Sequence, residues 1–118
     1  MATDPVVSDT PLSFRIEVEG DTAIVYCSGR LMAGETDALR SEVKKLFPTT
    51  KRIVLDLTNL TRMDSMGLGS IVSLYVSAKT AGCSIKMVNF GDRVRQLLII
   101  TNLLEVFEEY GKHAIKMP

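Results

Sequence analysis

Residues Arg52 to Leu57 form a nearly continuous apolar run in the middle of the chain, with the sequence Arg-Ile-Val-Leu-Asp-Leu. A strand whose two faces are both covered has this pattern, as in the interior of a parallel sheet. Parallel neighbours need crossover connections, which are usually helices. The run therefore predicts an α/β domain in which this strand is central.

Two further strands are predicted before this central strand. Residues Leu12 to Glu19 alternate between apolar and polar side chains, which is the period of a half-buried strand. Thr22 to Ser28 continues as a second strand, and Gly20-Asp21 supplies the tight turn of a hairpin. Residues 1–11 are rich in turn-forming types, so we expect a flexible arm there and one domain over residues 12–118.

Helical spacing of apolar residues alternates with the strands. The pattern predicts helices over Gly34 to Phe47, Met66 to Ala81 and Gly91 to Ile100, and a strand over Ser84 to Asn89. Leu103 to Phe107 is expected to form a short edge strand or a final turn. The expected order is β-β-α-β-α-β-α, which defines a single α/β domain with a mixed β-sheet.

The length and charge of the chain exclude several classes of protein. A chain of 118 residues has the size of one domain, and 14 Lys plus Arg balance 14 Asp plus Glu. A net charge of zero gives no field that favours nucleic acid or an anionic membrane. The apolar stretch Leu97 to Ile100 is too short to span a bilayer. We expect a cytoplasmic protein without direct nucleic-acid binding or membrane insertion.

The cysteines give no sign of a disulfide or a metal site. Cys27 and Cys83 each lie in or beside an apolar segment, and neither is close in sequence to the other or to His113. Free cysteine behaves as a small hydrophobic residue, so we expect two buried, reduced thiols. Four zinc ligands cannot be assembled from this inventory without unusual carboxylates. No metal and no cofactor are predicted.

Catalytic motifs are also missing from the sequence. Gly67-Leu68-Gly69 lacks the third spaced glycine of a dinucleotide fingerprint, and the chain has no Gly-Lys-Ser/Thr phosphate loop. Ser65 has no identifiable base, because His113 has no acidic partner near it in sequence. The sequence therefore does not predict an enzyme.

Ser65 stands where the helix after the central strand should begin, and two interpretations are open. Ser65 or Asp64 could cap the helix by accepting a hydrogen bond from an N–H group of its first turn. Alternatively, Ser65 is a phosphorylation acceptor: Gly67 and Gly69 leave room around it, and the helix N-terminus favours a phosphate.

The helix that follows Ser65 carries no charged side chain from Met66 to Ala78. A helix with a solvent-exposed face would normally carry some. We expect an inward face of Leu68, Ile71, Val72, Tyr75 and Ala78, and an outward side of Gly69, Ser70, Ser73, Val76, Ser77 and Thr80. Small neutral groups let another protein approach closely, so this side is predicted to bind a partner. The alternative is that other parts of this chain cover it.

The strand Ile53 to Leu57 followed by Met63-Asp64-Ser65-Met66-Gly67-Leu68-Gly69 resembles the STAS domain family, found in sulfate transporters and anti-sigma factor antagonists. The resemblance covers about Leu12 to Val106. Supporting matches are Gly29-Arg30-Leu31, Val88-Asn89, Val94-Arg95-Gln96-Leu97-Leu98, Asn102-Leu103 and Val106-Phe107.

The resemblance implies a function for Ser65. In bacterial anti-sigma factor antagonists, the serine at this position is phosphorylated by an anti-sigma factor that is also a serine kinase. The unphosphorylated antagonist binds this kinase and frees a sigma factor, and a PP2C-type phosphatase restores it. The implied role is thus that of a phosphoprotein in transcription regulation. Its expected partner-binding residues are Met32, Asp64, Ser65, Met66, Gly67, Gly69, Ser70, Ser73, Val76 and Ser77.

The sequence departs from the family pattern at two positions. Family members often have Ser, Thr or Ala where Met66 stands, and many have Asp or Asn where Met32 follows Leu31. The runner-up interpretation is a constitutive STAS subunit of a larger complex, such as a lipid-transport ATPase assembly, in which Ser65 only caps the helix. Whether the chain also forms a weak homodimer is left open.

Overall fold

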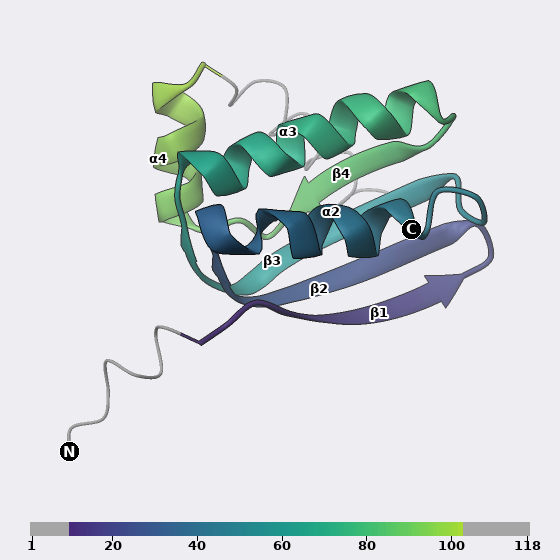
Figure 1. Ribbon diagram of the computed structural model, residues 1–118, viewed down its shortest axis with the longest axis horizontal. Helices are drawn as coiled ribbons and strands as arrows, with labels where there is room; N and C mark the ends of the chain where they lie inside the picture. Colours follow the sequence, from purple (N-terminus) through teal and green to yellow (C-terminus); the bar gives the residue numbers. More distant parts are fainter. Residues whose placement is uncertain (1–9, 103–118) are drawn as a thin grey trace.

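The protein folds as one four-stranded sheet with helices packed on it (Figure 1). The computed structural model describes residues 10–102. Its elements are β1 (Ser13–Glu19), β2 (Thr22–Leu31), η1 (Ala33–Glu35), α2 (Thr36–Lys44), β3 (Arg52–Met63), α3 (Ser65–Thr80), β4 (Ser84–Val88) and α4 (Asp92–Ile100). The strand order is β1-β2-β3-β4, with β1 antiparallel to β2 and the other pairs parallel. The predicted α/β domain with a mixed sheet and a central β3 is confirmed.

One face of the sheet carries the core. Helices α2 and α3 lie side by side over this face, and α4 stands at the end of the sheet next to β3 (Figure 1). Burial alternates along the strands: Ile53 and Leu55 are fully buried, whereas Val54 between them is half-buried. Within residues 10–102, helices therefore cover only one face of β3, whereas the apolar run predicts that both faces are covered.

The hairpin forms as predicted, and the chain before it is held against β2. Glu19 pairs with Thr22 across a two-residue turn, in which Gly20 has a φ of 62°. Before β1, the carbonyl oxygen of Thr10 accepts a hydrogen bond of 3.0 Å from the N–H of Arg30. Thr10 is thus tied to β2, although it belongs to the predicted arm. Residues 1–9 of that arm lie outside the described residues.

Both β2 and β3 are longer than predicted. β2 continues past Ser28 to Leu31, and β3 continues past Leu57 to Met63. The two strands stay paired through two register shifts, one between Tyr26 and Ser28 and one between Gly29 and Arg30. The additional part of β3 is mostly polar and has no apolar run of its own. Its extended conformation depends on pairing with β2, which no local pattern shows.

The two cysteines are buried and free, as predicted. Burial raises the pKa of the Cys27 thiol to about 12, and the negative charge of Asp56 adds to this shift. The Cys83 thiol donates to the carbonyl oxygen of Thr50 at 2.8 Å. Both thiols therefore belong to the core.

Two other expectations concern membrane spans and the end of the chain. Among the helices of residues 10–102, none is long and apolar enough to cross a membrane. The predicted strand or turn over Leu103 to Phe107, and also His113, lie outside the described residues.

Candidate functional site

The site forms where β2 and β3 end side by side. These parallel strands finish at register partners, Leu31 and Met63. The next residues, Met32 and Asp64, therefore leave the sheet at the same edge. The carboxyl ends of parallel strands are where open α/β sheets commonly build their sites.

Asp64 connects the two chain segments that leave this edge. One carboxylate oxygen, Oδ1, accepts a hydrogen bond of 2.8 Å from the N–H of Gly67 in the first turn of α3. The other, Oδ2, accepts from the N–H of Ala33 at 3.3 Å. Asp64 is thus the N-cap of α3 and also holds the connection between β2 and α2. Of the two predicted caps, the structure selects Asp64.

Ser65 is the first residue of α3, and its side chain is exposed. Because Asp64 caps the helix, the cap does not require the Ser65 hydroxyl. Ser65 is thus exposed at the positive end of a helix of 16 residues.

Gly67 has a packing role. A Cβ built on Gly67 would lie 2.2 Å from the carbonyl oxygen of Leu31 and 3.0 Å from the Cγ atoms of Leu31 and Met63. The start of α3 therefore rests directly on the end of β2. Gly69, by contrast, is exposed and has nothing within 4 Å of its Cβ position. Of the two glycines expected to leave room around Ser65, Gly69 does so and Gly67 does not.

The connection that contains Met32 is held by Glu35. The N–H of Met32 donates to Glu35 Oε1 at 3.1 Å, and Arg30 Nε lies 3.2 Å from Glu35 Oε2. Met32 is half-buried in this turn, and Ala33 is exposed beside it. The predicted partner-binding residue Met32 is thus brought to the same edge as Asp64 and Ser65.

An uncharged stripe runs along the outer side of α3. Met66, Gly69, Ser73 and Val76 follow one another at spacings of three and four residues and are all exposed. Met66 and Val76, at its two ends, are 59% and 58% exposed, so the stripe presents apolar side chains to the surface. Ser77 lies on its border and is half-buried. Within residues 10–102, no other element covers the stripe.

Two predicted partner-binding residues lie inside the protein instead. Ser70 is 1% exposed, and its hydroxyl group donates to the carbonyl oxygen of Gly67 at 2.6 Å. The prediction that places Ser70 on the outward side is wrong, because this internal hydrogen bond lets a small polar side chain fit the core. Gly67 is also buried, and Leu74, assigned to neither side, belongs to the inward face.

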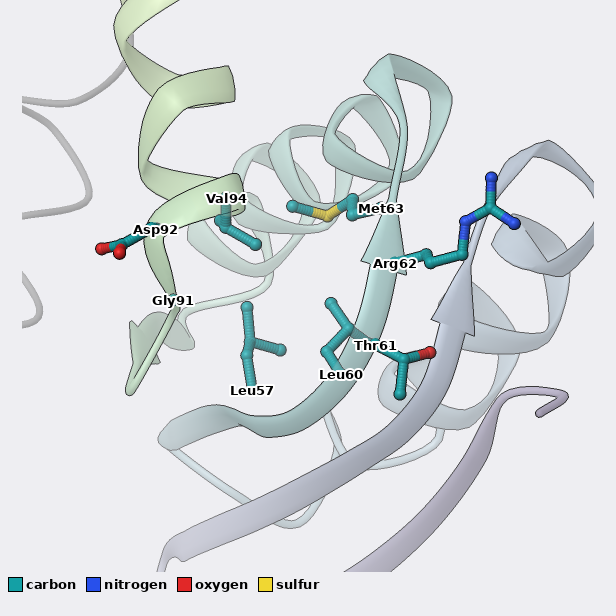
Figure 2. Close-up of a pocket in the computed structure, with 8 residues that line it drawn as sticks. All are labelled: Leu57, Leu60, Thr61, Arg62, Met63, Gly91, Asp92 and Val94. Atoms are coloured by element: carbon teal, nitrogen blue, oxygen red, sulfur yellow. The ribbon is translucent and has the colours of Figure 1, made fainter. Parts of the chain in front are cut away.

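A pocket of about 170 Å³ lies between the end of β3 and the start of α4. Figure 2 shows Leu57, Leu60, Met63 and Val94 directed into it, whereas the charged ends of Arg62 and Asp92 point away. No local sequence pattern predicts this pocket, because it depends on the part of β3 beyond Leu57. Its volume is below the roughly 300 Å³ at which small-molecule sites begin. Among residues 10–102, no cluster of three metal-ligating side chains occurs.

Comparison with known sequences identifies relatives over most of the chain. The family model of the STAS domain matches residues 13–115. A STAS-domain containing protein of Pseudomonas aeruginosa strain UCBPP-PA14 is 29% identical over 90 residues, which cover 76% of this chain and 89% of the relative. An anti-sigma-B factor antagonist of Bacillus subtilis strain 168 is 32% identical over 86 residues, with coverages of 69% and 79%.

Solved structures show the same fold. The anti-sigma factor antagonist SpoIIAA in its unphosphorylated form has a TM-score of 0.68 at 19% identity, covering 79% of this chain and 84% of that one. The phosphorylated form of the Bacillus cell fate determinant SpoIIAA has a TM-score of 0.63 at 18% identity, with coverages of 77% and 85%. The name anti-sigma factor antagonist describes a binding protein, which agrees with the prediction of a binding module instead of an enzyme. The chain belongs to the STAS domain family, and its relatives include anti-sigma factor antagonists.

Proposed function

We propose that this protein is an anti-sigma factor antagonist whose partner binding is switched by phosphorylation of Ser65. In its unmodified form it binds an anti-sigma factor that is also a serine kinase, in the cytoplasm, and so frees a sigma factor. The observation that carries this proposal is the position of Ser65. Its side chain is exposed at the start of α3, next to the uncharged stripe and to the end of β2.

The chemistry at Ser65 is a phosphoryl transfer. The γ-phosphoryl group of ATP passes to the Ser65 oxygen, the hydroxyl proton leaves to a base of the kinase, and ADP is released. A PP2C-type phosphatase reverses the modification by hydrolysis. The bond between Ser65 Oγ and phosphorus breaks, water supplies the fourth oxygen of the inorganic phosphate that leaves, and a proton restores the Ser65 hydroxyl group. This chain supplies only the acceptor, which α3 and the Asp64 cap hold in place.

The neutral side chains around Ser65 explain why a phosphate there should weaken partner binding. A phosphate carries about −1.5 to −2 charges, and it would enter a surface formed by the neutral side chains of Met66, Gly69, Ser73 and Val76. A partner that fits this neutral surface would have to desolvate the phosphate, which Asp64 beside it also repels. Disrupting such a contact costs about 2–4 kcal/mol, which corresponds to a roughly thirty- to thousandfold loss of affinity.

The relatives support the same role. Three of them are named anti-sigma-B factor antagonists at 32% identity, and the similar structure of SpoIIAA is known with and without phosphorylation. The proposed contact residues here are Met32, Asp64, Ser65, Met66, Gly69, Ser73, Val76 and Ser77. At the two positions where this chain departs from the family pattern, Met32 and Met66 supply apolar side chains, so the partner should offer an apolar surface there.

Affinity capture from a lysate of the native organism tests the proposal. The baits are the unmodified protein, Ser65→Ala, a form with phosphoserine installed at position 65 during translation, and Ser41→Ala as the control, because Ser41 is an exposed serine of α2 outside the proposed contact residues. We expect the unmodified, Ser65→Ala and Ser41→Ala baits to retain a serine-kinase anti-sigma factor, and the phosphoserine bait to lose it.

The retained kinase should then transfer labelled phosphate from ATP to the unmodified protein and to Ser41→Ala, but not to Ser65→Ala. Recovery of the same transporter or other complex by all baits would instead identify the protein as a constitutive subunit.

A further inference from the structure

We infer that Asp64 relays the presence of a phosphate on Ser65 to the connection between β2 and α2, so that one modification alters two parts of the surface. This inference rests on the proposed phosphorylation of Ser65. It concerns the response of this chain alone, and it can be measured without any partner.

The carboxylate of Asp64 holds two chain segments together. Its two carboxylate oxygens accept from N–H groups of two different segments, those of Gly67 in α3 and Ala33 in η1. Ala33 is 31 residues away from Asp64 in the sequence, so this contact is a tertiary one. Asp64 therefore joins the segment that carries Ala33 to the first turn of α3, in which Ser65 is exposed.

A phosphate on Ser65 competes with this carboxylate. The first N–H groups of a helix have no acceptor within the helix and form its positive end. Asp64 occupies that end through its bond to Gly67. A phosphate on the adjacent residue brings a second, more highly charged anion to the same N–H groups, and the two anions repel each other.

The bond to Ala33 is the one that should give way. The hydrogen bond from the Gly67 N–H to Asp64 is short, at 2.8 Å, and Gly67 packs directly against the carbonyl oxygen of Leu31. The hydrogen bond from the Ala33 N–H to Asp64 is longer, at 3.3 Å, and Ala33 is exposed. Glu35 separately holds the N–H of Met32, so the release should be confined to Ala33 and its exposed neighbour Gly34.

Amide hydrogen exchange, measured residue by residue by NMR, tests the relay. The protein with phosphoserine at position 65 is compared with the unmodified protein. We expect the Ala33 amide to exchange about tenfold faster after modification, which corresponds to the loss of one hydrogen bond of ordinary strength. The Thr58 amide, which donates to Asp56 Oδ1 at 2.9 Å, is the internal control and should not change.

Asp64→Asn is the matched variant, since the amide keeps a single acceptor oxygen. It should retain the cap at Gly67 and lose the bond to Ala33. The Ala33 amide should then exchange fast already, and phosphoserine at position 65 should accelerate it no further. An unchanged Ala33 amide in the phosphorylated protein, or an equal acceleration in Asp64→Asn, would overturn the relay.

The relay and the proposed function can fail separately. If phosphoserine accelerates exchange at Ala33 and leaves kinase binding intact, the relay stands and the switch fails. If phosphoserine abolishes kinase binding while Ala33 exchange stays constant, the switch stands and the relay is wrong.

Discussion

Gly67 packs its α-carbon against the carbonyl oxygen of Leu31, so closely that a Cβ on Gly67 would lie 2.2 Å from this oxygen. Gly67→Ala should therefore force α3 away from β2 and lower the free energy of unfolding by about 1–3 kcal/mol, as overpacking does in cores. Gly69→Ala is the control, because the space around Gly69 is open. It should raise stability by about 0.5–1 kcal/mol. Urea denaturation followed by circular dichroism measures both, and equal stabilities would contradict the close approach.

The assignment of the helix cap predicts different effects for two adjacent residues. Asp64→Ala removes the acceptor for the N–H groups of Gly67 and Ala33, and it should lower the free energy of unfolding by about 1–2 kcal/mol. Ser65→Ala removes an exposed hydroxyl group that the cap does not use, and it should change stability by less than about 0.5 kcal/mol. Thermal unfolding of both variants compares them. A loss in Ser65→Ala as large as that in Asp64→Ala would show that Ser65 is the cap.

The buried thiol of Cys27 makes stability depend on alkaline pH. Its pKa is about 12 in the folded protein, against an ordinary value of 9.0. Above pH 9 the unfolded chain loses the thiol proton while the folded protein keeps it, so the free energy of unfolding falls as the pH rises towards 12. The slope should approach about 1.4 kcal/mol per pH unit.

Cys27→Ala lacks this thiol and should show a shallower decline over the same pH range. Denaturant titrations of both proteins between pH 8 and pH 11 give the difference. Parallel pH profiles of the two proteins would contradict the raised pKa.

A charge placed in the uncharged stripe should prevent partner binding without unfolding the protein. Ser73 is exposed at the centre of the stripe, so Ser73→Glu should be tolerated by the fold. It should weaken binding of the captured kinase at least about tenfold, because an unpaired carboxylate would be desolvated in the interface. Thr49→Glu is the control, because Thr49 is exposed just before β3, at the end of the sheet opposite Ser65. Equal binding by both variants in surface plasmon resonance would place the interface elsewhere.

Local patterns predict the fold well where each residue's environment follows from its near neighbours. The apolar run of Arg52 to Leu57 identifies the central strand, and helical spacing identifies α2, α3 and α4. The polar part of β3 up to Met63 is missed because β2, a distant segment, holds it in the sheet.

The site, too, combines features that local sequence predicts with features that depend on distant segments. The sequence locates the junction at Asp64 and Ser65 but cannot choose between two residues that are both good caps. The choice depends on the position of Ala33, which the tertiary structure supplies. Helical spacing of the apolar residues of α3 leaves Ser70 on the outward side, and only the hydrogen bond from its hydroxyl group to the Gly67 carbonyl makes the interior acceptable. The proposed role in sigma factor control comes from the family resemblance and not from the spacing of residues.

The central claim is that the charge on Ser65 controls partner binding, and isothermal titration calorimetry tests it most directly. The captured kinase is titrated with the unmodified protein, with protein carrying phosphoserine at position 65, and with protein carrying phosphoserine at position 49 as the control. We predict that phosphoserine at position 65 weakens binding roughly thirty- to a thousandfold, and that the control leaves the Kd unchanged. The same Kd for all three proteins would contradict control of binding by Ser65.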